Sequence, residues 1–260
     1  MVTVVLALLP VLVGGVTHTV QWLLPHDVGS ELSLSVTVHM VLVLAAVVAA
    51  ILAARRRRAG LPRWAWIALL AGIVLFSSGE LWELVTRLGD SWVEETVRIA
   101  AFVPFAAFAW QVASPLTIVY WSRRRLAAMV LVAAALFAGI AAFELVPILA
   151  GAAPGDLKSG ALRALTLVRP FLDALLFLPL IVSLAFAGLR RRGEPYLFVG
   201  LGLLCELAGD ILFHYDLMTE APGLEEVAFL FTAASLAYFV IGSLWCALRR
   251  EHVPAEGVSP

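Results

Sequence analysis

Residues 35–58 read SVTVHMVLVLAAVVAAILAARRRR, an almost unbroken apolar run that ends in four arginines. Roughly 20 apolar residues are enough for a helix to cross the hydrocarbon of a bilayer. A basic cluster directly after such a run is typical of the cytoplasmic face of a membrane. The stretch therefore predicts a transmembrane helix near residues 35–54 that ends in the cytoplasm.

The rest of the chain has a similar composition. Of its 260 residues, 62% are hydrophobic and only 14% are charged, which is typical of membrane proteins. At roughly 20 residues per span, little sequence is left for a soluble domain. We therefore expect neither a soluble enzyme nor a kinase or nucleotide-driven module, and no nucleic-acid partner.

Apolar runs of spanning length occur eight times and predict an all-α fold, a polytopic membrane bundle of eight transmembrane helices. The predicted spans are residues 2–24, 35–54, 64–86, 96–121, 126–150, 164–189, 195–216 and 226–248. Together they form one transmembrane domain over residues 1–250, followed by a short cytoplasmic tail at 251–260. A seven-span alternative omits the first helix and places the N-terminus outside.

Arginine clusters set the orientation of the predicted bundle. They follow the even-numbered spans, at Arg55–Arg58, Arg123–Arg125, Arg190–Arg192 and Arg249–Arg250. Under the positive-inside rule the face that carries them is cytoplasmic. We therefore expect an inner or plasma membrane protein with both termini in the cytoplasm.

The same clusters divide the chain into helical hairpins and suggest two loosely similar four-helix halves, residues 1–125 and 126–250. The best internal match lies between the second and fourth hairpins, where LFSSGE at 75–80 resembles CELAGD at 205–210. Parallel repeats of this kind occur in membrane carriers. Chance similarity between two Ala/Leu-rich hairpins stays open as the alternative.

Ionisable side chains within the spans are the candidate functional residues, because each costs roughly 2.5–3.5 kcal/mol to insert. Most lie in the outer half of the predicted membrane. The candidate ligand-binding residues are Glu80, Glu83, Glu144, Arg169, Asp173, Glu206 and Asp210, and the candidate metal ligands are His18, His39 and His214. A divalent metal is thus a potential cofactor, and Glu80 and Asp210 are the candidate catalytic residues.

A spacing of four residues places Glu206, Asp210 and His214 on one face of their helix. We expect Glu80 to join Asp210 and His214 at one outward-open site if the two matching hairpins pack about a common axis. Arg169 is expected to pair with one of the acids. A purely structural network of paired charges is the alternative for the whole layer.

Three kinds of chemistry fit this polar layer: a divalent-metal site, a proton relay, and acid/base hydrolysis at the level of the lipid headgroups. A transporter also needs a route to the cytoplasm. For that route the sequence offers one polar stripe in the fourth span, formed by Gln111, Ser114 and Thr117. The stripe is short, which favours an outer site over a full transport path.

Two Gly-acid pairs, Gly79-Glu80 and Gly209-Asp210, together with Arg169-Pro170 and Ser235–Tyr238, resemble the YhhN-type lysoplasmalogenase family. The resemblance implies an eight-helix membrane hydrolase that cleaves vinyl-ether lysophospholipids. The chain departs from the family pattern where Glu80 replaces Asp and Ser235 replaces His. Multi-span sensor regions of signalling proteins end in similar Gly-Asp hairpins.

The leading hypothesis is an outward-facing intramembrane site that binds a cation, a proton or a small polar ligand for transport or sensing. The alternative is a membrane hydrolase of lysolipid headgroups. A second alternative is a sensor or assembly subunit that acts through a partner. The expected partners are membrane lipid and either a partner membrane protein or further copies of the chain.

Overall fold

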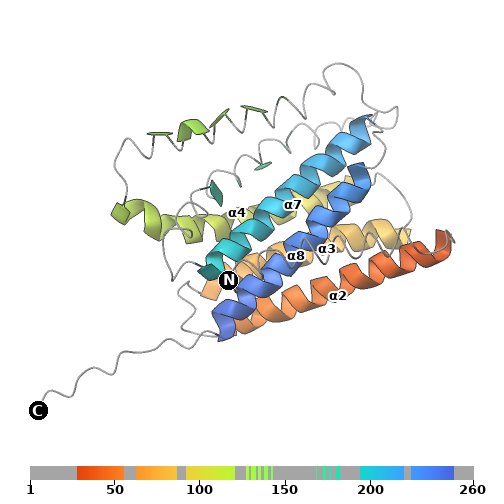
Figure 1. The fold of residues 1–260 in the computed structure, drawn as a ribbon, viewed down its shortest axis with the longest axis horizontal. Coiled ribbons are helices and arrows are strands. Elements are labelled where there is room, and N and C mark those ends of the chain that lie inside the picture. The colour runs from red at the N-terminus through yellow and green to blue at the C-terminus, as the bar shows by residue number, and fades with distance from the viewer. Residues whose placement is uncertain are drawn as a thin grey trace, which may run out of the picture.

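The computed structural model describes residues 28–55, 63–86, 92–120, 194–219 and 224–248, together with scattered residues within 127–142 and 168–181. Every residue described in these ranges is helical, which agrees with the all-α prediction. Figure 1 shows the long helices as coiled ribbons. They are α2 (Val28–Arg55), α3 (Arg63–Thr86), α4 (Trp92–Tyr120), α7 (Glu194–Thr219) and α8 (Leu224–Leu248).

These five helices match five of the predicted spans to within a few residues, except at the start of α2. Hydropathy predicted a start at residue 35, whereas α2 begins at Val28. Residues 29–33, which are mostly polar or small, continue the helix beyond the apolar run, because hydropathy marks the apolar part of a helix rather than its ends. The predicted spans 2–24, 126–150 and 164–189 lie wholly or largely outside the described residues.

Four of the described helices are long and apolar enough to cross a membrane. Their spanning segments are Thr37–Arg55, Thr96–Ala113, Tyr196–Phe213 and Val227–Leu248. In α3 the corresponding apolar segment, Arg63–Gly79, is shorter. Helices satisfy their own backbone hydrogen bonds, which is what the interior of a bilayer requires. The chain is thus a helical membrane protein.

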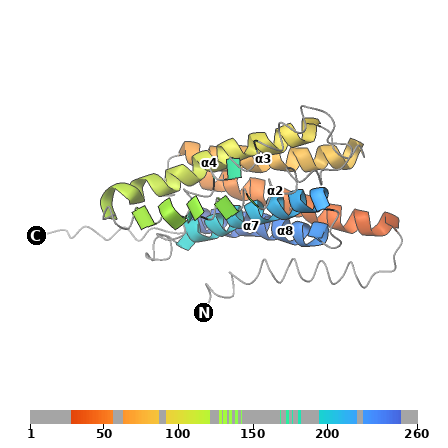
Figure 2. The same cartoon turned by 90° about the horizontal axis from the view of Figure 1, so that it is seen from above.

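The five helices form two hairpins and one bridging helix. Helix α3 packs along α4, α7 packs along α8, and α2 packs against both α3 and α8. Helices α4 and α7 meet over only a short length. Figure 2 shows α3 and α4 on one side of the bundle and α7 and α8 on the other. The hairpins thus form two layers that α2 joins.

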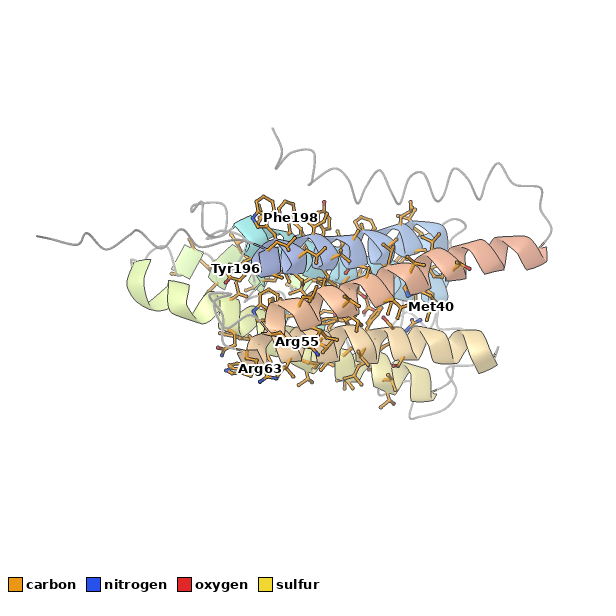
Figure 3. All side chains as sticks on the ribbon, turned by 90° about the horizontal axis from the view of Figure 1, so that it is seen from below. Met40, Arg55, Arg63, Tyr196 and Phe198 are labelled. Carbon is orange, nitrogen blue, oxygen red and sulfur yellow. The ribbon has the colours of Figure 1, made fainter. Side chains whose placement is uncertain are left out.

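One end of the bundle is basic. Arg55 at the end of α2 and Arg63 at the start of α3 lie at the same end as Tyr196 near the start of α7, whereas Met40 lies toward the other end (Figure 3). We call these the basic end and the far end. Helices α3 and α7 run toward the far end, and α4 and α8 return from it.

Close contacts within each hairpin depend on glycine. A methyl group at Gly72 of α3 would overlap the ring of Phe105 on α4. On α7, a methyl group at Gly209 would lie 3.1 Å from the carbonyl oxygen of Ala228 on α8. Small residues let membrane helices approach closely, because association there depends on packing more than on the hydrophobic effect.

Aromatic rings join the two layers in the core. Phe105 of α4 and Phe239 of α8 lie with ring centroids 5.8 Å apart, and both side chains are buried. On the outside of α2, Val41, Leu44 and Val48 are exposed at a helical spacing. An exposed apolar stripe of this kind is suited to contact with lipid.

Candidate functional site

A cavity of about 30 Å³ lies where the two hairpins meet near the far end of the bundle. Helices α3, α4, α7 and α8 all contribute to its wall. On α4 and α8 the lining begins within two turns of the helix start, at Arg98 and Ala228. The lining residues are Phe76, Arg98, Gly209, Asp210, Phe213, Ala228, Phe229 and Thr232. We call this the far-end cavity.

Arg98 is the cation of the far-end cavity, and its side chain is only 6% exposed. Its guanidinium carbon lies 4.8 Å from the ring centroid of Phe213 on α7 and 6.0 Å from that of Phe76 on α3. The negative face of a phenyl ring attracts a cation at these distances, most strongly where water is excluded. The two rings therefore hold the Arg98 charge at the seam between the hairpins.

Asp210 is the anion of the cavity and is 3% exposed. It follows Gly209, whose missing side chain lets α8 approach so closely that a methyl group there would meet the Thr232 hydroxyl at 3.2 Å. This close approach brings Thr232 into the same wall as Asp210. A carboxylate and a hydroxyl from neighbouring helices thus line one small space.

The Thr232 hydroxyl already donates a hydrogen bond within its own helix. Its Oγ1 donates a hydrogen bond of 3.3 Å to the carbonyl oxygen of Ala228, one turn earlier on α8. A hydroxyl oxygen can still accept hydrogen bonds after donating one. Thr232 can therefore accept a hydrogen bond from a molecule in the cavity while its own proton is satisfied.

The far-end cavity combines opposite charges with apolar walls. A cavity needs at least about 10–15 Å³ to hold one water molecule, and several polar partners to keep it there. The far-end cavity exceeds that size, and Arg98, Asp210 and Thr232 supply donor and acceptor groups. The site is therefore suited to water or to a polar molecule of similar size.

Of the predicted site residues with described side chains, Asp210 alone lines the far-end cavity. Glu206 and Asp173 are also buried, and the Nε2 atom of His39 is buried on α2. His39, Asp173 and Glu206 each interact with a neighbouring group. Asp173, Glu206 and Asp210 are thus all buried within the described part of the bundle.

Several predicted site residues cannot be placed at the cavity from the described side chains. Glu80, Glu83 and His214 belong to α3 and α7, but their side chains lie outside the described residues. The others that lie outside them are His18, Glu144 and Arg169. The predicted convergence of Glu80 and His214 on Asp210, and the pairing of Arg169, remain predictions.

Sequence reasoning missed Arg98, together with the two rings and the hydroxyl around it. Arg98 stands two residues inside the predicted span 96–121, where a long basic side chain normally reaches out to water. The match between the second and fourth hairpins could have drawn attention to Arg98. Arg98 follows Glu80 by 18 residues, and Ala228 follows Asp210 by the same 18. Both members of this second pair line the cavity.

The described side chains do not support a metal site by themselves. Among them, no three His, Cys, Asp or Glu residues lie close enough together to hold an ion. Of the candidate metal ligands, only His39 has a described side chain. A divalent-metal site therefore stays a hypothesis that depends on residues such as His18 and His214.

The fold and the cavity define a class, a helical membrane protein with a small cavity lined by charged, polar and aromatic side chains. No protein-family model, curated protein or solved structure matches the chain.

Proposed function

We propose that the chain is an eight-span plasma membrane protein whose far-end cavity faces outward and binds a small polar ligand for transport or sensing. In this proposal both termini and the basic end lie in the cytoplasm, as the arginine clusters indicate. Membrane lipid covers the exposed apolar stripe of α2. If the chain is a sensor, a partner membrane protein or further copies of the chain would pass on the signal of ligand binding.

One observation carries the proposal: Arg98, Asp210 and Thr232 line a single cavity at the seam between the hairpins. A purely structural charge pair needs no cavity beside it. In low-dielectric surroundings the positive charge of Arg98 offsets the attraction of Asp210 for a second cation. This charge balance favours a small neutral polar molecule over a metal cation.

The size of the cavity separates this proposal from the hydrolase alternative. Pockets for drug-sized ligands occupy about 300–1,000 Å³, whereas the far-end cavity measures about 30 Å³. A lysolipid hydrolase would use Glu80 and Asp210 as its catalytic residues and would need a groove for an acyl chain beside them. The observed volume supports the small ligand.

The proposal is tested by thermal unfolding of the purified chain in detergent with three small solutes. Ammonium, formate and formamide serve as the cation, the anion and the neutral molecule. A ligand that binds only the folded state raises stability as its concentration rises, by about 2.7 kcal/mol at 100 times its Kd. We expect formamide to stabilise the chain most, at concentrations below those that denature proteins generally.

Asp210→Asn and Thr232→Val serve as the site variants, and Ser78→Ala serves as the control. Ser78 is exposed on α3 and donates to the Val74 carbonyl oxygen at 2.6 Å. The stabilisation should shrink in both site variants and persist in the control. Equal responses of all four proteins to every solute would exclude ligand binding at the cavity.

A further inference from the structure

Phe229 differs from the other residues that line the far-end cavity. Six of the eight lining residues are buried, and Phe213 is half-buried. Phe229 is the exposed member of the set, at 51%. A residue that borders a cavity and also reaches the molecular surface separates the two. Phe229 therefore forms the part of the wall between the far-end cavity and the surroundings of the bundle.

The place of Phe229 on α8 accounts for this exposure. Ala228 and Thr232 lie one turn apart on the side of α8 that approaches α7, where a methyl group at Gly209 would contact both. Each residue turns an α-helix by about 100°. Phe229, one residue after Ala228, therefore lies at the flank of the α7–α8 contact rather than within it.

The surface on the outer side of Phe229 is apolar helix. Phe229 belongs to the spanning segment Val227–Leu248 of α8, close to its start. Charged groups such as those of Arg98 and Asp210 are costly where they meet hydrocarbon. An aromatic side chain at this point shields the charges of the cavity from the membrane, so the wall is thin but functionally important.

Phe229 is also better placed to move than the two other rings of the cavity. Phe76 and Phe213 lie 6.0 and 4.8 Å from the guanidinium carbon of Arg98, and a shift of either ring would weaken its attraction for that charge. Exposed side chains change rotamer within picoseconds to nanoseconds. A change at Phe229 can therefore alter the space in the cavity and leave its charged groups in place.

We propose that Phe229 is the specificity-determining residue of the far-end cavity, and that its ring restricts the cavity to the smallest neutral polar ligands. This inference rests on the proposed function and deepens it, because it names size as the property by which ligands are selected. An amide is the model ligand. Its N–H groups would donate to Asp210 and Thr232, its carbonyl oxygen would accept from Arg98, and any carbon chain would need the space that the Phe229 ring takes.

The test is thermal unfolding of the purified full chain in detergent with formamide, acetamide and propionamide. These three solutes share an amide group and differ in the length of their carbon chain. The rise of stability with concentration gives an apparent Kd for each solute. One methylene changes the selectivity of a fitted pocket by about 10–200-fold, so we expect the parent to bind formamide at least about tenfold more tightly than propionamide.

Phe229→Ala removes the ring and should reduce this ratio to less than about threefold, chiefly by tighter binding of propionamide. Phe229→Leu should give an intermediate ratio, and it supplies the result if the alanine variant does not fold. Phe229→Trp keeps a large ring and should keep the ratio of the parent. Melting without solute shows which variants are folded.

Trp110→Ala is the matched control, because Trp110 is an aromatic residue of α4 that is 44% exposed and stands apart from the cavity lining. It should keep the ratio of the parent. A folded Phe229→Ala or Phe229→Leu protein with an unchanged ratio would overturn the proposal. So would a parent that binds all three amides equally, or a Trp110→Ala protein that loses the ratio as Phe229→Ala does.

The same measurements separate this inference from the proposed function. If formamide stabilises the parent and Asp210→Asn weakens that effect, but the Phe229 variants keep the ratio, the cavity binds its ligand and Phe229 does not select it. If none of the amides stabilises the parent, both proposals fail.

Discussion

Arg98 is a buried cation that contacts two aromatic rings at the far end of the bundle. Its charge lies between the rings of Phe76 and Phe213, which belong to different hairpins, and it shares a cavity with Asp210. Isolated charges in a low-dielectric site are costly, whereas opposite charges that are close together offset that cost. Arg98 and Asp210 should therefore depend on each other.

Arg98→Ala should destabilise the protein by about 3–5 kcal/mol, because it leaves the carboxylate of Asp210 buried without a cation in its cavity. Arg98→Lys should recover only part of this loss, because an ammonium group does not reproduce the planar stacking of a guanidinium. Unfolding in mild detergent, followed by tryptophan fluorescence, measures both differences.

Arg63→Ala is the control for the loss of an arginine, because Arg63 is exposed at the start of α3. It should change the free energy of unfolding by less than about 0.5 kcal/mol. The double variant Arg98→Met, Asp210→Leu should be less destabilised than the sum of its single changes. Additive effects would mean that Arg98 and Asp210 do not interact.

Residue types and hydropathy were enough to single out Asp173, Glu206 and Asp210 as acids within predicted spans. All three are buried, because a carboxylate inside an apolar run has few alternatives to turning inward. Residue types and hydropathy were not enough to predict that the Arg98 side chain is buried. A cation near the end of a span can reach water, so its burial depends on which rings neighbouring helices bring to it. That information is in the packing of the hairpins and not in the span itself.

At the scale of the elements, the α7–α8 hairpin shows how closely helices approach where glycine is present. Gly202 and Gly209 face α8, and each would bring a methyl group within 3.2 Å of atoms there. The contacts at Gly209 include a backbone oxygen, which cannot move without shifting the helix. The position of Thr232 in the cavity wall therefore depends on Gly209.

Gly209→Ala should destabilise the protein by about 1–3 kcal/mol, because the added methyl group would crowd the contact between α7 and α8. Gly139→Ala is the matched control, since a methyl group there meets no atom within 4 Å. It should be neutral or stabilising by up to about 1 kcal/mol, as alanine favours a helix more than glycine does.

Thermal melting of the two glycine variants beside the parent gives the comparison. Both changes bring the same gain in helix propensity, so the difference between them isolates the clash at α8. Equal melting temperatures would show that α8 can move away from the added methyl group without a loss of stability. Loss of solute stabilisation in a folded Gly209→Ala protein would show that the displacement reaches the cavity.

Hydropathy located the described helices well, because membrane-spanning length is a property of local composition. It failed at the start of α2, where Gly29, Ser30, Glu31 and Ser33 interrupt the apolar pattern but are still helical. The apolar run gives no signal there, since helix formation outside the bilayer depends on backbone hydrogen bonds rather than on hydrophobicity.

At the scale of the whole molecule, the far-end cavity exists because two hairpins meet across a short contact between α4 and α7. Sequence similarity indicated that the second and fourth hairpins are alike, but not that α2 packs against both. Which helices become neighbours depends on the fit of small and aromatic residues such as Gly72 and Phe105. Hydropathy carries no information of that kind.

The orientation of the whole bundle gives the last prediction. Arg55 and Arg63 lie at one end of the described helices, and the far-end cavity lies toward the other. If the basic end is cytoplasmic, the cavity faces outward and meets ligands from outside the cell. If the basic end is outside the cell, the cavity faces the cytoplasm and meets ligands from there.

Reporter fusions after Arg58, Arg125, Arg192 and Arg250 should all report the cytoplasm, because each follows a basic cluster at the end of an even-numbered span. A fluorescent protein that folds only in the cytoplasm and a phosphatase that is active only outside give opposite signals at each site. A fusion after Asp90, in the loop between α3 and α4, is the internal control and should report the outside. Outside results at some but not all of the four basic sites would refute the eight-span topology. Inverted results at all five sites would keep the eight spans but turn the cavity toward the cytoplasm.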